Sequence, residues 1–128
     1  MNAAAGALVA AFGTHDRAGY FASFAPSATF IFYNSDRVFK SRAAYEAEWK
    51  EWETSGFKVL ACASLNSEVM VLTQDVAVFT HQVRTTLNTA DGVMDTGERE
   101  TIVFQLLDGK WLGVHEHLSI DPTFVEGQ

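Results

Sequence analysis

Residues 99–119 read RETIVFQLLDGKWLGVHEHLS, and this stretch carries the clearest structural signal in the chain. Its two halves, Arg99 to Leu107 and Trp111 to Ser119, are rich in the β-branched and aromatic residues that strands favour. Between them, Asp108-Gly109 is a strong hairpin signal. We therefore predict an antiparallel hairpin over this stretch.

The predicted hairpin also determines which side chains face one another. A three-residue turn, Asp108 to Lys110, sets Ile102 opposite Glu116. Glu100 shares the face of Ile102, because residues two apart on a strand point to the same side. The register thus predicts two carboxylates on one face of the sheet.

Strand and helix signals continue outward from the hairpin. Further strands are predicted at Ala28 to Tyr33, at Phe57 to Asn66 and at Val76 to Leu87. The first of these is followed by the turn Asn34 to Arg37 and by a short partner strand at Val38-Phe39. Asp91-Gly92 is a second hairpin signal. A first helix is predicted at Ala3 to Phe12 and is ended by Gly13. A second, short helix is capped by Thr14 or Asp16 and contains Tyr20, Phe21 and Phe24. A third helix is predicted at Arg42 to Thr54 and is capped by Ser41.

Helices first and long antiparallel strands afterwards indicate the α+β class, with the helices covering one face of a sheet. We expect one domain over residues 1–128, with an end that packs through Phe124 and Val125 and then frays. A strongly bent sheet wrapped on helices leaves a cavity at its open end, which is a usual place for a small-molecule site.

Composition and charge narrow the function classes. The formal net charge of −7 disfavours nucleic acid or an anionic membrane as partner, because binding phosphates requires a positive field. A single cysteine, Cys62, excludes an intrachain disulfide and a zinc site of several thiolates. No apolar stretch reaches the roughly 18 residues that span a bilayer. The alanine-rich start lacks a preceding basic residue, so we expect a helix rather than a signal peptide, and a cytoplasmic protein.

The order of elements resembles the nuclear transport factor 2-like superfamily, which includes ketosteroid isomerases and SnoaL-like cyclases. The residues Glu100 to Phe104, Asp108 to Trp111 and Val114 to Ser119 are similar to the association domain of calcium/calmodulin-dependent protein kinase II. The resemblance implies a conical half-barrel of the cystatin-like type, a pocket between sheet and helices, and a homodimer formed through the outer sheet face. It implies no reaction, because one fold hosts many functions.

Comparison with ketosteroid isomerases by residue type argues against their activity. Those enzymes use a carboxylate base and a Tyr–Asp oxyanion hole. The resemblance places Phe32 at the base position, Leu8 at the Tyr position and Ile102 at the Asp position, and all three are apolar.

The resemblance implies that the side chains of Glu116 and Leu118 face the pocket. Glu116 and Glu100 are the candidate catalytic residues, since carboxylates in an apolar pocket raise each other's pKa. The alternative is that they lie at the solvated rim or pair with an arginine. Arg84 is the expected partner and matches a pocket arginine of the association domain, whereas Ile102 and Leu118 replace its other arginines.

Trp49 and Trp52, at helical spacing, and Phe32 form either the pocket's aromatic wall or ordinary core, and we expect the two roles to overlap.

His115 and His117 share a face of their strand. A metal site or a proton relay is one interpretation. The resemblance favours another, because it places both histidines with Trp111 on the outer face, near the dimer interface. We expect no metal and no cofactor.

Two functions follow from these observations. The first is a self-associating domain with a semi-apolar pocket for a small apolar or carboxylate-bearing molecule. The alternative is a SnoaL-like cyclase, isomerase or hydratase that acts on a small hydrophobic carbonyl compound, with Glu116 or Glu100 as general acid or base.

Overall fold

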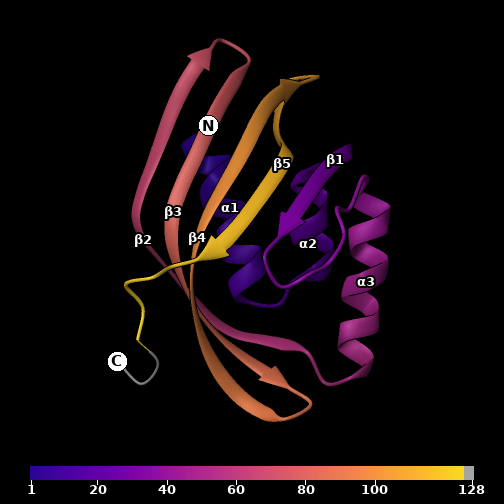
Figure 1. Ribbon diagram of the computed structural model, residues 1–128. Helices are drawn as coiled ribbons and strands as arrows, with labels where there is room; N and C mark the ends of the chain where they lie inside the picture. The colour runs from indigo at the N-terminus through magenta and orange to yellow at the C-terminus, as the bar shows by residue number, and fades with distance from the viewer. Residues whose placement is uncertain (126–128) are drawn as a thin grey trace.

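The computed structural model describes residues 1–125, and its elements come in the predicted order (Figure 1). They are α1 (Asn2–Gly13), α2 (Arg17–Ala22), β1 (Phe24–Phe32), α3 (Arg42–Thr54), β2 (Lys58–Thr73), β3 (Val76–Thr89), β4 (Gly92–Leu107) and β5 (Lys110–Ile120). Residues 126–128, where we expected the chain to fray, lie outside the described residues. Among residues 1–125, no helix has the length and apolar character needed to cross a bilayer.

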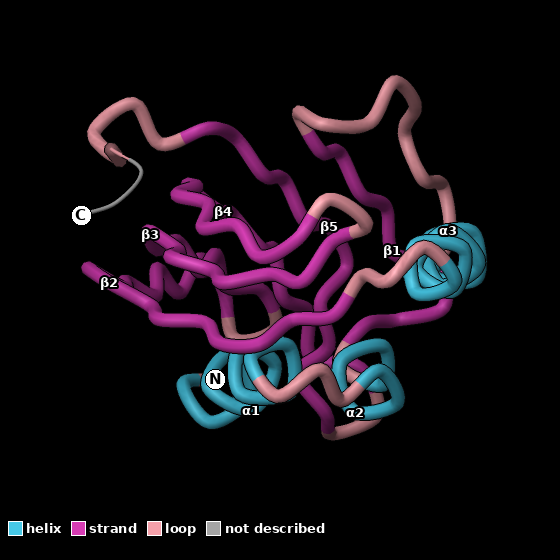
Figure 2. The backbone as a smooth tube through the Cα atoms, turned by 90° about the horizontal axis from the view of Figure 1, so that it is seen from below, coloured by secondary structure: helices cyan, strands magenta, loops and turns pink. Residues whose placement is uncertain are grey.

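The strands form one open, mixed sheet in the order β1-β5-β4-β3-β2. β1 runs parallel to β5, and the other neighbours are antiparallel. The three helices pack on the concave side of the curved sheet (Figure 2). This is the expected α+β arrangement of a curved sheet wrapped on N-terminal helices.

The core lies between this concave face and the helices, and it is unusually aromatic. Trp49 of α3, Tyr20 of α2 and Phe30 of β1 are almost fully buried. The rings of Tyr20 and Trp49 lie 5.3 Å apart between centroids. Two predicted caps hold the helices in place: Asp16 accepts from the backbone N–H of Gly19, and Ser41 from that of Ala44.

The β4–β5 hairpin reaches the predicted register by a different route. Its turn has two residues, Asp108 and Gly109, both with positive φ as a type I′ turn requires. The register then shifts by one residue between Gly113 and His115, a β-bulge at Val114. Ile102 therefore stands opposite Glu116, as predicted.

The bulge also corrects the placement of Trp111, which we expected on the outer face beside His115. Trp111 stands opposite Leu106 and packs against the core, so it points inward. The extra residue at Val114 reverses the alternation, and His115 consequently points outward, opposite Val103.

Several element boundaries also differ from the prediction. β1 begins at Phe24, which we had placed in the second helix, and Pro26 lies within the strand. β1 is an edge strand with a register irregularity between Phe24 and Thr29, which is where proline is tolerated. The Val38-Phe39 strand is reduced to a single bridge between Phe30 and Phe39. β2 and β4 extend well beyond their apolar segments, because their distal halves are exposed hairpin arms.

Candidate functional site

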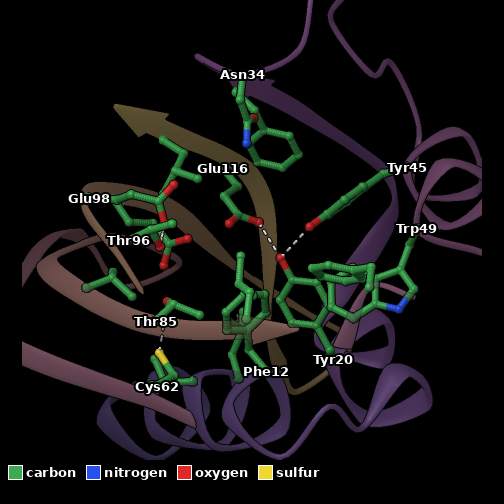
Figure 3. A pocket seen from close by; sticks show the side chains of 18 of the residues that line it. Phe12, Tyr20, Asn34, Tyr45, Trp49, Cys62, Thr85, Thr96, Glu98 and Glu116 are labelled. Atoms are coloured by element: carbon green, nitrogen blue, oxygen red, sulfur yellow. Dashed lines mark hydrogen bonds between the residues drawn. The ribbon is translucent and has the colours of Figure 1, made fainter. Parts of the chain in front are cut away.

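A cavity of about 90 Å³, partly open to solvent at its mouth, lies between the helices and the concave sheet face. Its walls are mainly aromatic, and no lysine or arginine occurs among the described residues that line it. The aromatic rings are those of Phe12, Tyr20, Phe32, Tyr45, Trp49, Trp52 and Phe57. Figure 3 labels Phe12, Tyr20, Tyr45 and Trp49. This volume lies below the range of about 300–1,000 Å³ typical of small-molecule pockets.

Four ionisable side chains from neighbouring strands form the sheet side of this apolar cavity. They are His81 of β3, Glu98 and Glu100 of β4, and Glu116 of β5. Glu98 and Glu100 share a face because they are two residues apart, and Glu116 joins them because it stands opposite Ile102 of the same face. The sheet register therefore gathers three carboxyl groups at one place.

Glu116 is the most deeply placed of the three, with 3% of the residue exposed. The Tyr20 hydroxyl donates a hydrogen bond of 2.8 Å to Glu116 Oε1, and the Tyr45 hydroxyl lies 3.1 Å from that of Tyr20 (Figure 3). Burial raises the pKa of Glu116 well above its usual value, and the neighbouring Glu100 raises it further. The surroundings of Glu116 therefore favour its protonated form.

Glu100 is hydrogen-bonded to Glu116 and to His81. Burial raises the pKa of Glu100, while the hydrogen bond with Glu116 acts in the opposite direction. Two adjacent buried carboxyl groups cannot both be charged at low cost, so the pair favours holding a proton. The hydrogen bond between them raises the pKa of Glu116 and lowers that of Glu100, which favours the proton on Glu116. Glu100 is then the anionic member of the pair.

His81 joins Glu100 to the neighbouring strand. Its Nε2 lies 2.7 Å from Glu100 Oε1, and its Nδ1 lies 2.6 Å from the Ser64 hydroxyl oxygen. The side chain is only 1% exposed, and burial lowers the pKa of His81 to about 4. The ring is therefore neutral at pH 7, and its contact with Glu100 is a hydrogen bond rather than an ion pair.

Glu98 lies nearer the edge of the cavity. The Tyr33 hydroxyl donates a 2.7 Å hydrogen bond to its Oε2. Burial raises the pKa of Glu98, although the bond from Tyr33 acts in the opposite direction.

Most of the residues predicted for the pocket line this cavity. They are Glu116, Glu100, Trp52, Trp49, Phe32 and Leu118. Ile102 lies on the same sheet face but is completely buried beneath the cavity rather than exposed to it. The two interpretations of the aromatic residues, core and pocket wall, both apply to Trp49.

Arg84 is the one predicted pocket residue that points away, and that prediction is wrong. On β3 the inward face is formed by alternate residues that include His81, Val83 and Thr85, so Arg84 lies on the outer face. Its guanidinium lies 2.9 Å from Asp121 Oδ2 and over the ring of Phe124. The predicted Arg84–Glu pair is replaced by the Glu100–Glu116 pair.

Sequence reasoning placed Tyr20 and Tyr45 in the possible aromatic wall of the pocket, but it missed His81 and Glu98 as pocket residues. A usable signal was present on β3, where the set Ala77, Phe79, His81, Val83 and Thr85 is more apolar than the set that includes Arg84. The more apolar set is the one expected to face a core.

His115 and His117 share the outer face, with ring centroids 6.3 Å apart. Thr29 Oγ1 lies 2.8 Å from His115 Nδ1. Burial, together with the neighbouring His117, lowers the pKa of His115. Within residues 1–125, no group of three His, Cys, Asp or Glu side chains is arranged to hold a metal ion.

Comparisons with known proteins bear on this site. A family model described as a SnoaL-like domain matches residues 1–122. No curated protein matches the chain.

Similar solved structures agree on the fold. A Xanthomonas campestris protein, provisionally described as a calcium/calmodulin dependent protein kinase II association domain, is 26% identical, with a TM-score of 0.75 over 91% of this chain and 82% of that one. A ketosteroid isomerase-like protein from Erwinia carotovora atroseptica is 19% identical, with a TM-score of 0.79 over 94% of each chain. An NTF2-like protein of unknown function in nutrient uptake from Rhodospirillum rubrum is 18% identical, with a TM-score of 0.79 over 92% of this chain and 95% of that one. At 19% and 18% identity, the last two likenesses concern the fold alone.

Proposed function

The chain belongs to the SnoaL-like domain family, and on that premise we propose that its cavity binds a small hydrophobic carbonyl compound and catalyses a proton transfer on it. The reaction class is an isomerisation, cyclisation or hydration, each of which moves a proton at or next to a carbonyl group. The observation that carries this proposal is the buried Glu100–Glu116 pair at the sheet side of an aromatic cavity. A rim position, which would favour a passive role, does not fit an exposure of 3% for Glu116.

The pair offers an acid and a base side by side. Glu116, held as a carboxylic acid, donates a hydrogen bond or its proton to the substrate's carbonyl oxygen, while Tyr20 orients the acid through its 2.8 Å bond. Glu100, the anionic partner, removes the proton from the adjacent carbon. A proton passing between the two carboxyl groups then restores the starting state. General acid–base help of this kind contributes roughly 10²–10⁴-fold to a rate.

The proposal does not include ketosteroid isomerase chemistry. The residues at that enzyme's base and tyrosine positions, Phe32 and Leu8, contribute only hydrocarbon to the cavity, and Ile102 is buried beneath it. The acid and base proposed here come from β4 and β5.

The test measures hydrogen exchange at the carbon next to a carbonyl group, so the natural substrate need not be known. The probe is 1-tetralone in D₂O, and deuterium incorporation is followed by NMR. We expect the protein to accelerate incorporation, and Glu116→Gln to reduce that acceleration by about 10²-fold or more. Glu51→Gln, at an exposed site on α3, is the matched control. Equal acceleration by Glu116→Gln and the unchanged protein contradicts the role of Glu116.

A second candidate function, self-association as a homodimer, is favoured by the outer face of the sheet. Ile31, Val78 and Val103 lie on this face with Thr29, Thr80 and Thr101, and Ile31 is 36% exposed. The description of the Xanthomonas campestris protein as an association domain supports the same idea. His115 and His117 belong to this surface, and Trp111 does not.

Native mass spectrometry tests the dimer. We expect a dimer for the unchanged chain and a monomer for Val103→Glu, which places a charge at the centre of the outer face. Lys50→Glu, at an exposed site on α3, changes the charge on the opposite side of the sheet and should remain dimeric. A monomer mass for the unchanged chain would rule out the dimer.

A further inference from the structure

A continuous chain of hydrogen bonds crosses the concave face of the sheet, from the surface to the carboxyl pair. Ser64 Oγ lies 2.6 Å from His81 Nδ1, and His81 Nε2 lies 2.7 Å from Glu100 Oε1. Glu100 is hydrogen-bonded to Glu116, which accepts from Tyr20. β2, β3, β4 and β5 each contribute at least one member, although these residues are far apart in the sequence.

The direction of every hydrogen bond in this chain can be assigned by counting protons. Tyr20 donates to Glu116, and the Glu116 carboxyl donates to the anionic Glu100. Glu100 can only accept, so the neutral imidazole carries its proton on Nε2 and donates it there. Nδ1 is then the acceptor, and the Ser64 hydroxyl donates to it. Each bond has one proton, and Glu100 receives bonds from both sides.

The two ends of this path differ in their access to water. The His81 side chain is 1% exposed, and the charged or titratable groups facing its ring are Glu100 of β4 and Glu116 of β5. Ser64 is exposed and lines a second, open groove between α1 and β2. Ser64 does not line the main cavity, so a ligand there leaves the exposed Ser64 in contact with solvent.

We propose that Ser64 and His81 form a proton relay that connects the Glu100–Glu116 pair with solvent through the groove between α1 and β2. In one passage, a proton from water binds Ser64 Oγ, the hydroxyl proton of Ser64 moves to His81 Nδ1, and the Nε2 proton moves to Glu100. Charge and protons balance, because one proton enters at Ser64 and Glu100 gains one. The reverse passage releases a proton. Its use in catalysis rests on the proposed function: the relay sets the protonation state of the pair while substrate closes the cavity.

The same three groups resemble the Ser–His–acid triad of hydrolases, but their chemistry here differs. A triad histidine must take the serine proton as a base. Burial lowers the pKa of His81 to about 4, which makes it a poor base for a hydroxyl group. Glu100 is also shared with the Glu116 carboxyl, which weakens its support of a charged imidazole. Relay through a neutral ring requires neither property.

The test uses the ligand-free protein with ¹⁵N-labelled histidine. NMR first identifies which ring nitrogen of His81 carries the proton, and then measures how fast that proton exchanges with water. We expect the proton on Nε2 at pH 7. Ser64→Ala removes one hydrogen bond from the path, and we expect it to slow the exchange of the His81 ring proton about tenfold.

Two further variants separate a relay from a structural role. Ser64→Thr restores the hydroxyl and should restore the exchange rate. Ser67→Ala, a second exposed serine that lines the same groove, should leave the rate unchanged. An unchanged rate in Ser64→Ala, or a proton on Nδ1 rather than Nε2, overturns the relay. Because no ketone is present, this result is independent of the deuterium-incorporation test of the proposed function.

Discussion

At the scale of single residues, Glu116 is the group whose surroundings most affect the chemistry of this protein. Its carboxyl group lies in an apolar cavity, receives a bond from Tyr20 and adjoins the anionic Glu100. Burial and the neighbouring Glu100 favour the protonated form of Glu116, although the hydrogen bond from Tyr20 acts in the opposite direction. Ionising Glu116 therefore destabilises the folded state, so the free energy of unfolding depends on pH.

We predict that the free energy of unfolding falls as the pH rises above about 6.5, where His81 is neutral in both the folded and the unfolded state. The pKa of Glu116 is raised in the folded protein, so between its unfolded and folded values the native state holds a proton that the unfolded chain has released. Stability from this group is complete below the unfolded pKa and is lost as the pH rises toward the folded one. The slope is at most about 1.4 kcal/mol per pH unit for one proton. Urea unfolding at several pH values measures it.

Glu116→Gln should reduce this slope, because glutamine mimics the protonated acid and does not titrate. Glu51→Gln, at an exposed position, should keep the slope of the unchanged protein. Below about pH 6.5 His81 has the opposite effect on the free energy of unfolding. Burial lowers its pKa to about 4, so the unfolded chain takes up a proton that the folded protein does not, and stability falls as the pH falls. Equal slopes for Glu116→Gln and the unchanged protein would show that another group titrates in this window.

At the scale of elements, the bulge in β5 determines which residues face the cavity. On the turn side of Val114, Trp111 and Gly113 face inward, and beyond it Glu116 and Leu118 do. Without the extra residue, the carboxyl group of Glu116 would lie on the outer face of the sheet. The bulge also brings Gly113 against Phe24 of β1, where a backbone without a side chain is required.

We predict that Gly113→Ala destabilises the fold by about 1–3 kcal/mol, because an added Cβ is an overpacked group in a filled core. That Cβ would lie 2.6 Å from Cδ1 of Phe24, which is itself fully buried and cannot move away. Chemical denaturation followed by tryptophan fluorescence gives the free energy of unfolding.

The same substitution in α1 should act in the opposite direction. Gly6 is exposed, and an added Cβ there meets nothing within 4 Å. Gly6→Ala should therefore stabilise the fold by about 0.5–1 kcal/mol, through the higher helix propensity of alanine. A loss of stability in Gly6→Ala, or none in Gly113→Ala, would contradict the packing described for these sites.

At the scale of the whole molecule, the segment after β5 is fastened to the outer face rather than to the cavity. Asp121 is buried and accepts bonds from Gln82 and Arg84 of β3, and Phe124 lies beneath the Arg84 guanidinium. Arg84 thus joins the end of the described chain to the middle of the sheet. Its role is structural, whereas the sequence predicted a pair with a pocket glutamate.

We predict that Arg84→Met leaves deuterium incorporation into 1-tetralone unchanged and makes the segment after Ile120 several-fold more sensitive to proteases. The methionine keeps apolar contact with Phe124 but loses the ion pair with Asp121. Mass spectrometry of the early cleavage products locates the sites. A loss of deuterium incorporation with unchanged protease sensitivity would indicate instead that Arg84 acts in the cavity.

Much of this architecture was predictable because it depends on local chemistry. Hairpin residues such as Asp108-Gly109, caps such as Ser41 and the alternation within β5 indicated the elements, their order and the pairing of Ile102 with Glu116. The predicted pair of inward carboxylates follows from that pairing. Element ends were less predictable, because the exposed arms of β2 and β4 have no buried face to produce a hydrophobic pattern.

The amino-acid sequence by itself determined the α+β class and the cavity's aromatic wall, since each depends on residue type and period. The pairing of Ile102 with Glu116 was predicted from a three-residue turn, whereas the structure reaches it through a two-residue turn and a bulge. Only the tertiary structure decided that Trp111 points inward, that Arg84 binds Asp121, and that His81 joins Ser64 to Glu100. The reason is physical: a one-residue bulge reverses the side of the sheet that each residue faces, and contacts between separate strands depend on how the sheet bends. Neither leaves a signature in the local sequence.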